Sequence, residues 1–435
     1  MVYRMGLLVL LVAVVFVTAW QLLGSTGGRV MDAPGEQQFL KRHWRTPIPP
    51  QGAPPRGFSP LESSLLPESC GSCHVRQYQD WQGSLHSRAM GPGVVGQTVV
   101  MEKGDPATAR LCWSCHAPLS EQQPVLLQTA QSGEREWVAN SAFDPDLQRH
   151  GVTCAACHVR QHRRFGPPRR ETQEVTGKVD EGLPHAGFVA QGAFGSSDFC
   201  KGCHQFEPDG YALNGKLIEN TWQEWRESGY PARGVQCQGC HMPDRRHLWR
   251  GIHDAETTRR GVTIVVETSR RNPAVGELFQ ARLTITNSGT GHYFPTYVTP
   301  RVVVSGVQAD AGGVAIPATR QEMTIGREVT LDLSEEIFDS RIAPGASSSF
   351  VYVQKVVEGA YRLHLQIRVE PDYFYEKFFR TMLDEGLAEK GRDLIRQAWN
   401  DSRSSSYLLF EKVWLVEHHG AGQLHSFPLS FSHAD

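Results

Sequence analysis

The sequence has no excess of charge of either sign. Its 435 residues include 44 basic and 46 acidic side chains, and the formal net charge is −2 at pH 7. Proteins that associate with nucleic acid through electrostatics carry a strongly basic surface or tail. The balance of charges gives no such case here, so we expect no nucleic acid among the binding partners.

Cysteine is absent outside a single kind of motif, and it is absent altogether after residue 240. The ten cysteines form five Cys-x-x-Cys-His motifs with none left over: Cys70, Cys73, Cys112, Cys115, Cys154, Cys157, Cys200, Cys203, Cys237 and Cys240. A disulfide framework would not require a histidine after every second cysteine. Zinc sites also use paired cysteines, but five complete repeats favour the attachment signature of c-type haem.

The spacing within the motif fits covalent attachment of haem. Two thiols three residues apart can each form a thioether with one vinyl group, and the adjacent histidine then becomes the proximal iron ligand. These histidines are His74, His116, His158, His204 and His241. The sequence therefore predicts five covalently bound haem c groups.

The N-terminus has one long apolar run but no clear Ala-x-Ala cleavage site after it. The uncharged run extends from Met5 to Gly28 and follows Arg4. Its length suits a signal peptide or a membrane-spanning helix. We expect an uncleaved anchor at residues 1–28 in the bacterial inner membrane, with the remaining chain in the periplasm because Arg4 marks the cytoplasmic side. Export after signal cleavage is the alternative.

The next two segments lack the pattern of an ordinary folded core. Residues 29–64 are rich in proline without periodicity, which predicts an extended tether. Residues 65–255 provide only about 38 residues for each haem, too few for an apolar core of the usual size. We expect a loop-rich, short-helix multihaem domain that depends on haem for its stability.

The composition changes after residue 255. Apolar and polar residues alternate at 279–286 and 361–369, which is typical of half-buried strands. About six such strands separated by glycine and asparagine turns predict a β-sandwich-like domain at 256–435. One inserted helix is expected at about 373–399. The predicted fold class is α+β, preceded by the membrane helix.

Two stretches of the haem region repeat. Residues 78–86 echo residues 222–230, and 151–154 echo 234–237. Each longer copy contains an aromatic-x-acid-Trp unit that suits a short helix, whose tryptophan packs against a haem face or against another helix. The first copy ends in His86 and the second in Tyr230, so only the first offers an imidazole.

The flanks of two motifs resemble the cytochrome c554-type multihaem family. The matching segments are Trp81-x-x-Ser84-x-His86 with Ala89-Met90, and Gly234-Val235 through His241-Met242-Pro243. The resemblance covers about residues 65–255 and implies that His86 is a distal axial ligand. The Gly-His-x-Phe-Pro loop at 291–295 is similar to one in C-terminal β-domains of several multihaem cytochromes, where the histidine can ligate a haem.

Six histidines are candidates for the distal positions of five irons, so at least one is surplus. They are His86, His150, His185, His247, His253 and His292. If His292 is a ligand, it serves its own haem domain or a neighbouring subunit. Met90 is an alternative sulfur ligand. His43 lies in the tether, and His162, in a basic stretch, is expected to be solvated.

These features predict an electron-transfer protein. A chain of largely bis-histidine haems would relay electrons between redox partners, such as a membrane quinol-oxidising donor and a soluble acceptor. The alternative is an oxidoreductase that acts on a small nitrogen or sulfur compound at one open haem. No motif ends in Cys-x-x-Cys-Lys, which disfavours a nitrite reductase, and no catalytic residue is singled out.

Overall fold

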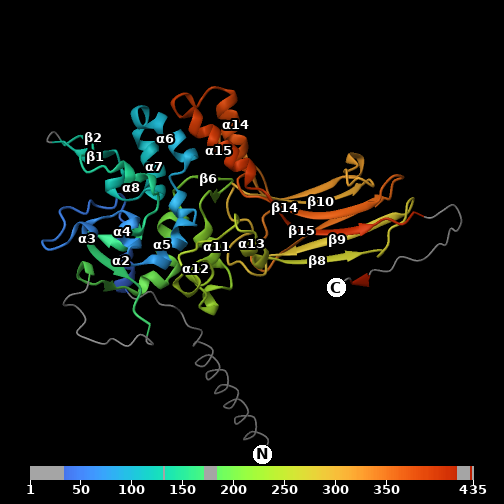
Figure 1. Cartoon of the computed structure of the whole chain (residues 1–435), viewed down its shortest axis with the longest axis horizontal. Coiled ribbons are helices and arrows are strands. Elements are labelled where there is room, and N and C mark those ends of the chain that lie inside the picture. The colour runs from blue at the N-terminus through green and yellow to red at the C-terminus, as the bar shows by residue number, and fades with distance from the viewer. Residues whose placement is uncertain (1–33, 131–132, 171–183, 419–431, 434–435) are drawn as a thin grey trace, which may run out of the picture.

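The fold combines a helical, loop-rich part with a β-rich part. A computed structural model describes residues 34–130, 133–170, 184–418 and 432–433. Helices and loops fill one end of an elongated molecule and two β-sheets fill the other (Figure 1). The expected mixture of short helices and a C-terminal β region is confirmed. The predicted membrane helix at 1–28 lies outside the described residues, and within the described ranges no helix is long and apolar enough to cross a membrane.

The helical part is built from short helices, several of which begin at a proline. Proline suits the first helical turn because its fixed φ is already helical and no hydrogen bond is lost there. The helices are α2 (Pro34–His43), α3 (Pro60–Ser63), α4 (Pro67–Gly71), α5 (Val75–Gln82), α6 (Pro92–Gly104), α7 (Pro106–His116), α8 (Pro145–Arg149), α9 (Cys154–His158), α10 (Lys201–His204), α11 (Thr221–Glu227), α12 (Cys237–His241) and α13 (Ala255–Gly261).

Strand is scarce in this part, as expected. The strands are β1 (Val125–Thr129), β2 (Arg135–Ala139), β3 (Val159–Arg160), β4 (Arg163–Gly166), β5 (Val189–Ala190), β6 (Ala212–Leu213) and β7 (Lys216–Leu217). They form two hairpins and one three-stranded sheet. The buried apolar clusters of this part are small compared with that of the β region.

The predicted tether at 29–64 is wrong for its central section. Residues 34–43 form α2, in which Phe39 and His43 are buried. Ile48 is buried against Leu119 in a cluster of the helical part. The apolar side chains of this segment contact the domain that the tether was expected to hold at a distance. Residues 45–47 and 52–57, among the described part of the segment, retain the exposed, proline-containing character of the prediction.

The β region consists of two antiparallel sheets. One has five strands in the order β12-β11-β10-β14-β15, and the other has four in the order β13-β9-β8-β16. The strands are β8 (Thr263–Thr268), β9 (Leu278–Thr286), β10 (Arg301–Ala309), β11 (Gln321–Val329), β12 (Glu336–Asp339), β13 (Ser347–Lys355), β14 (Arg362–Glu370), β15 (Tyr407–Leu415) and β16 (Ser432–His433). The sequence pattern missed β11, β12 and β16.

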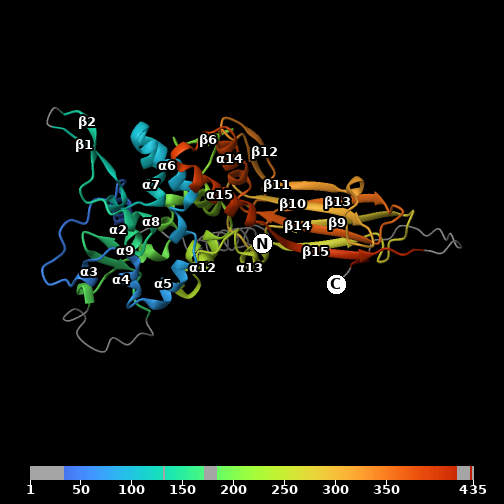
Figure 2. The ribbon, with the colours of Figure 1, turned by 45° about the horizontal axis from the view of Figure 1, so that its top comes forward.

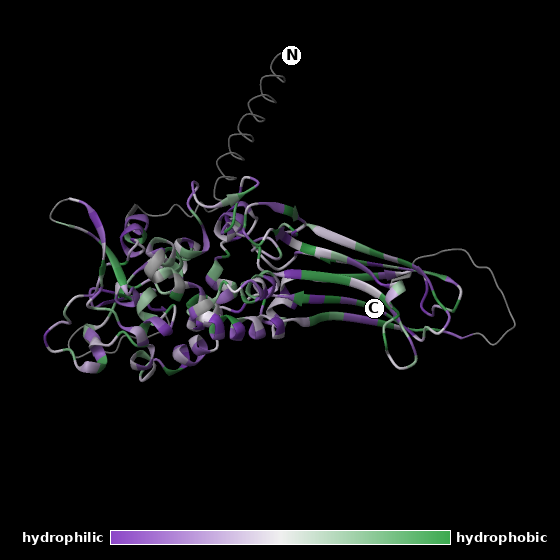
Figure 3. Ribbon diagram, turned by 90° about the horizontal axis from the view of Figure 1, so that it is seen from above, coloured by the Kyte–Doolittle hydropathy of each residue, from purple (hydrophilic) through white to green (hydrophobic). Residues whose placement is uncertain are grey.

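Both sheets contribute to one apolar core. Phe279 and Leu283 of β9 and Leu363 and Leu365 of β14 are fully buried in the same cluster. Buried and more exposed positions alternate along these strands. Figure 3 shows hydrophobic and hydrophilic stretches interspersed along the strands of the β region. The β11 strand escaped detection because its buried face contains Arg327, a charged residue whose partner lies on β12.

The predicted single helix at 373–399 is wrong, because two helices occupy this stretch. They are α14 (Tyr373–Asp384) and α15 (Arg392–Ser404). Helix α15 packs on α6 of the haem region (Figure 2), whereas α14 packs on α15 and also contacts β11 through Phe374 and Lys377. Phe379 of α14 also lies close to α6, since a Cβ at Gly93 would lie 2.6 Å from Phe379 Cζ. The insertion therefore forms a wall of the haem region.

Candidate haem-binding sites

Each Cys-x-x-Cys-His motif coincides with a short helical turn. The second, third, fourth and fifth motifs lie on α7, α9, α10 and α12, each of which ends at the motif histidine. In the first motif, α4 ends at Gly71 and His74 precedes α5. None of the ten cysteines forms a disulfide. Among the described residues, no group of three metal-ligating side chains forms the converging set that a zinc site needs.

Thiols of different motifs lie in contact with one another. The thiols of Cys70 and Cys154, of Cys115 and Cys203, and of Cys200 and Cys237 lie close enough to interact. Cys157 is also close enough to Cys200 and Cys203 to influence them electrostatically. The five attachment points therefore form one continuous cluster. The spatial order runs from the first motif to the third and fourth, and the second and fifth motifs both adjoin the fourth.

Hydrogen bonds at Nδ1 orient most of the motif histidines. His116 Nδ1 is 2.7 Å from the Ala89 carbonyl oxygen, and His158 Nδ1 is 2.7 Å from that of Phe165. His241 Nδ1 lies 2.8 Å from the Arg250 carbonyl oxygen, and His204 Nδ1 lies 2.7 Å from the Tyr297 hydroxyl. A carbonyl only accepts, so in His116, His158 and His241 the Nδ1 atom carries the hydrogen and Nε2 is left to bind iron.

Three of the motif histidines have a second histidine at the separation expected across one metal. Imidazoles on opposite sides of a metal, with bonds of about 2 Å, have ring centroids roughly 6 Å apart. The observed centroid separations are 6.3 Å for His204–His86, 6.1 Å for His158–His247 and 6.3 Å for His241–His292. His292 thus lies beside the fifth motif of its own chain. His86 accompanies the fourth motif rather than the first, which it follows in sequence.

His185, another of the candidate distal ligands, lies near the first motif. Burial lowers the pKa of the His74 imidazole, and the nearby His185 lowers it further. His185 Nδ1 lies 2.9 Å from the Gly187 carbonyl oxygen, which repeats the orientation seen at the motif histidines. His247 and His292 follow the same pattern, with Nδ1 directed at the carbonyl oxygens of Arg245 and Tyr293.

The remaining two candidates are not brought to a motif histidine. His150 Nε2 pairs with Glu68 at 3.3 Å, and His253 Nε2 hydrogen-bonds with Asp372 at 3.0 Å. Sequence reasoning could not distinguish these two from His247 or His292. It also placed His43 in the tether and His162 in solvent, whereas both side chains are buried.

Burial keeps His86, His158, His204 and His292 neutral. It lowers the pKa of His86 to about 3, and those of His158, His204 and His292 to about 4. The cause is the same in each case, because a charged ring is poorly solvated inside the protein. Neutral imidazole is the state that binds a metal.

The second motif has different surroundings. No described histidine is in ring contact with His116, but two polar side chains lie near its thiols. Glu219 is close to Cys115, and Tyr375 of α14 is close to Cys112 and Glu219. Burial raises the pKa of Glu219 to about 8. Met90 is buried with Trp113 in the cluster beside α7.

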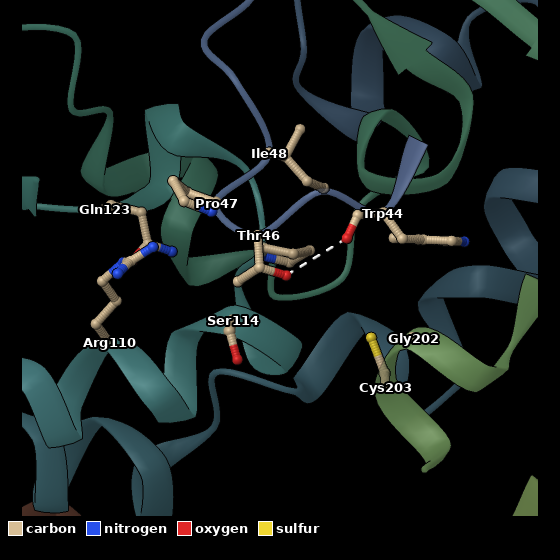
Figure 4. A pocket seen from close by; sticks show the side chains of 10 residues that line it. Trp44, Thr46, Pro47, Ile48, Arg110, Ser114, Gln123, Gly202 and Cys203 are labelled. Atoms are coloured by element: carbon tan, nitrogen blue, oxygen red, sulfur yellow. Dashed lines mark hydrogen bonds between the residues drawn. The ribbon is translucent and has the colours of Figure 1, made fainter. Parts of the chain in front are cut away.

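A hollow lies between the second and fourth motifs (Figure 4). Trp44 and Thr46 line one side of the hollow. Ser114 of the second motif and Cys203 of the fourth motif line the other side. Nε1 of Trp44 is buried there without a hydrogen-bond partner in the protein, and so is Nδ1 of His86 near the fourth motif. Unsatisfied buried groups of this kind fit a site completed by a bound group with a polar periphery, as haem has.

Comparison with known proteins supports the haem assignment. The family model "Cytochrome c554 and c-prime" matches residues 69–159, which contain the first three motifs. A search of curated proteins found no match.

Two solved structures align with the chain. A penta-heme cytochrome c552 from Thermochromatium tepidum matches with a TM-score of 0.55 at 17% identity, covering 82% of this chain and 100% of that one. At this identity the likeness shows the fold alone. The Northeast Structural Genomics Consortium target SoR45 aligns at 12% identity over 38% of this chain and 97% of its own, with a TM-score of 0.16, too low to carry an argument.

Proposed function

We propose that the chain is a multihaem c-type cytochrome that relays electrons between redox partners through five haem c groups, most of them held between two histidines. One observation carries the proposal: three motif histidines have a second histidine 6.1–6.3 Å away. When bound, haem supplies reversible one-electron chemistry, and two imidazoles leave its iron no open position for a substrate.

The protein contributes spacing and environment to this relay. The contacts between thiols of neighbouring motifs favour close approach of their cofactors. His158, His204 and His292 are buried and neutral, and would hold iron in surroundings of low polarity. Hydrogen bonds at Nδ1 fix the orientation of most of these rings and tune them as ligands.

Optical spectra of the purified protein test the relay. We expect the oxidised and reduced forms to show predominantly low-spin haem, and we expect carbon monoxide or nitrite to leave most of the spectrum unchanged. A predominantly high-spin spectrum that responds to these ligands would contradict the proposal.

The proposed location is the periplasmic face of the bacterial inner membrane, with residues 1–28 as the anchor. The long uncharged run and Arg4 before it support this proposal. Donor and acceptor would then be a membrane quinol-oxidising protein and a soluble redox protein. Mass spectrometry of the mature N-terminus tests the anchor, because a chain that starts beyond about residue 20 would be a cleaved and exported product.

A second candidate function concerns the second motif. Glu219 and Tyr375 are titratable groups beside Cys115 and Cys112, and either could hold a proton near a small ligand at this site. This observation favours an oxidoreductase acting on a small nitrogen or sulfur compound. Binding of nitrite to a minor high-spin fraction would support it. Loss of that binding in Tyr375→Phe or Glu219→Gln, with an unchanged low-spin fraction, would assign it to this motif.

A further inference from the structure

The repeated units of the haem region contain two buried acid–tryptophan pairs. Asp80 and Trp81 are adjacent on α5, and Glu224 and Trp225 are adjacent on α11. All four side chains are less than 10% exposed. Helix α11 lies next to α12, on the side of the haem region that faces the sheets (Figure 1).

The tryptophans anchor the chain just ahead of two haem motifs. Trp81 Nε1 donates to the Val152 carbonyl oxygen at 2.8 Å, and Trp225 Nε1 donates to that of Val235 at 3.0 Å. Each valine lies two residues before the first cysteine of its motif, the third or the fifth. In both copies of the Gly-Val-x-Cys sequence, the valine carbonyl therefore accepts a hydrogen bond from the tryptophan of a repeated unit.

In the first copy, the acid holds the histidine on the other side of the same site. Asp80 Oδ2 accepts a hydrogen bond from the backbone N–H of His247 at 3.0 Å and another from Arg246 Nε at 2.6 Å. His247 is the histidine paired with His158 of the third motif. One helical turn thus contacts the chain on both sides of the third site.

The second copy makes the corresponding contacts at the fifth site. Glu224 Oε2 accepts from the backbone N–H of Tyr293, the residue after His292, at 3.0 Å. Arg341 Nη1 donates to Glu224 Oε1 at 2.9 Å. His292 is the histidine paired with His241. A buried carboxylate, an arginine partner and a neighbouring tryptophan therefore recur at both sites, although Asp80 contacts the backbone of His247 itself and Glu224 contacts that of the residue after His292.

We propose that Asp80–Trp81 and Glu224–Trp225 are positioning pairs, each of which fixes the separation between the proximal and distal histidines of one iron, the third and the fifth respectively. The inference rests on the proposed bis-histidine function of these sites. Each carboxylate acts through the backbone next to the distal histidine, and each tryptophan acts through the backbone that precedes the cysteines.

The test uses the full-length protein purified with its haems attached. In Asp80→Asn, we expect the low-spin signal of one haem to be lost or shifted in the electron paramagnetic resonance spectrum, with the other signals unchanged. Glu224→Gln should affect one different haem. Added imidazole should restore the low-spin signal in each variant, because it can occupy a distal position that the histidine has left.

Glu336→Gln is the matched control. Glu336 forms a buried ion pair with Arg327 at 2.8 Å, with both side chains under 5% exposed, but it contacts no histidine. Its loss removes the same chemical interaction, so we expect lower stability and unchanged haem signals. A comparable change of signal in this control would overturn the inference, because the effect would then be one of general stability.

Two further variants distinguish a failure of the positioning role from a failure of the proposed bis-histidine function. His247→Ala and His292→Ala should each convert one haem to high spin; if neither does, the ligand assignment itself fails. If both do while Asp80→Asn and Glu224→Gln leave all signals as in the unmodified protein, only the positioning role fails. Should Asp80→Asn not fold, Trp81→Phe keeps the packing and removes the hydrogen bond, and the same single signal should shift.

Discussion

The histidines of this chain differ in which ring nitrogen is hydrogen-bonded. In His247 and His292, Nδ1 faces a backbone carbonyl and Nε2 is left for a metal. In His150 and His253, Nε2 itself pairs with a carboxylate. This single-atom difference separates ligand candidates that look alike in the sequence.

His86→Ala tests the pairing at the fourth motif. The His86 ring lies 6.3 Å from that of His204, so we expect one haem to change from low to high spin in the optical spectrum. His150→Ala is the control and should leave the spectrum unchanged, because His150 pairs with Glu68. An unchanged low-spin spectrum in His86→Ala would contradict the assignment.

Among the secondary-structure elements, β12 connects the sheets to the haem region through charge. Asp339 of β12 accepts a hydrogen bond from Lys216 of β7 at 2.6 Å and also pairs with Arg341, which bonds to Glu224. Burial acts to raise the pKa of Asp339, but its hydrogen bonds with Arg341 and Lys216 hold the pKa below the usual 3.8. The contact is therefore formed by an ionised carboxylate.

This contact predicts sensitivity to acid. A carboxyl whose folded-state pKa is depressed stabilises the fold above its unfolded-state pKa, and the contribution is lost as the pH falls below about 4. In Asp339→Asn, we expect the free energy of unfolding at pH 7 to fall by about 1–3 kcal/mol and to depend less on pH below 4. Denaturant unfolding at several pH values measures both effects.

Glu322→Gln is the control for that series. Glu322 forms an exposed ion pair with Arg320, so its loss should change the free energy of unfolding by less than about 0.5 kcal/mol. If the free energy of unfolding depended on acid pH equally in Asp339→Asn and in the unmodified protein, Asp339 would not be the origin of the acid sensitivity.

Helices α14 and α15 lie between β14 and β15 in the sequence, and α15 packs on α6 of the haem region. Ile395 of α15 is fully buried, and its side chain packs closely against Gly96 of α6. We expect Ile395→Ala to lower the free energy of unfolding by about 2–5 kcal/mol, because it leaves a cavity at this interface.

Thermal or denaturant unfolding measures the effect of Ile395→Ala. Leu387→Ala, in the same insertion but 57% exposed, should change the stability by less than about 0.5 kcal/mol. Equal effects of the two substitutions would show that the packing on α6 contributes little.

For the whole molecule, the two parts differ in how they are stabilised. The sandwich has one extensive apolar core shared by both sheets, whereas the haem region has several small clusters. Protein produced without haem attachment should therefore keep a protected sandwich and lose the structure of residues 65–255. Hydrogen exchange followed by mass spectrometry measures this difference. Comparable protection of both parts without haem would contradict it.

The sequence by itself determined the features that depend on local chemistry. Five Cys-x-x-Cys-His motifs indicate haem attachment wherever they occur, because the thiols and the histidine are adjacent in the chain. Alternation likewise predicted β9 and β14, because period two reflects a strand with one buried face. It failed for β11, where a buried Arg327 is compensated by a residue on another strand.

Only the tertiary structure decided which groups meet across distance. It brought His86 to the fourth motif, His247 to the third and His292 to the fifth, and it packed residues 34–51 on the haem region. It also gave the repeated acid–tryptophan units a shared set of contacts. Distal ligands come from remote segments, so their pairing depends on how the chain packs, and no local spacing records it.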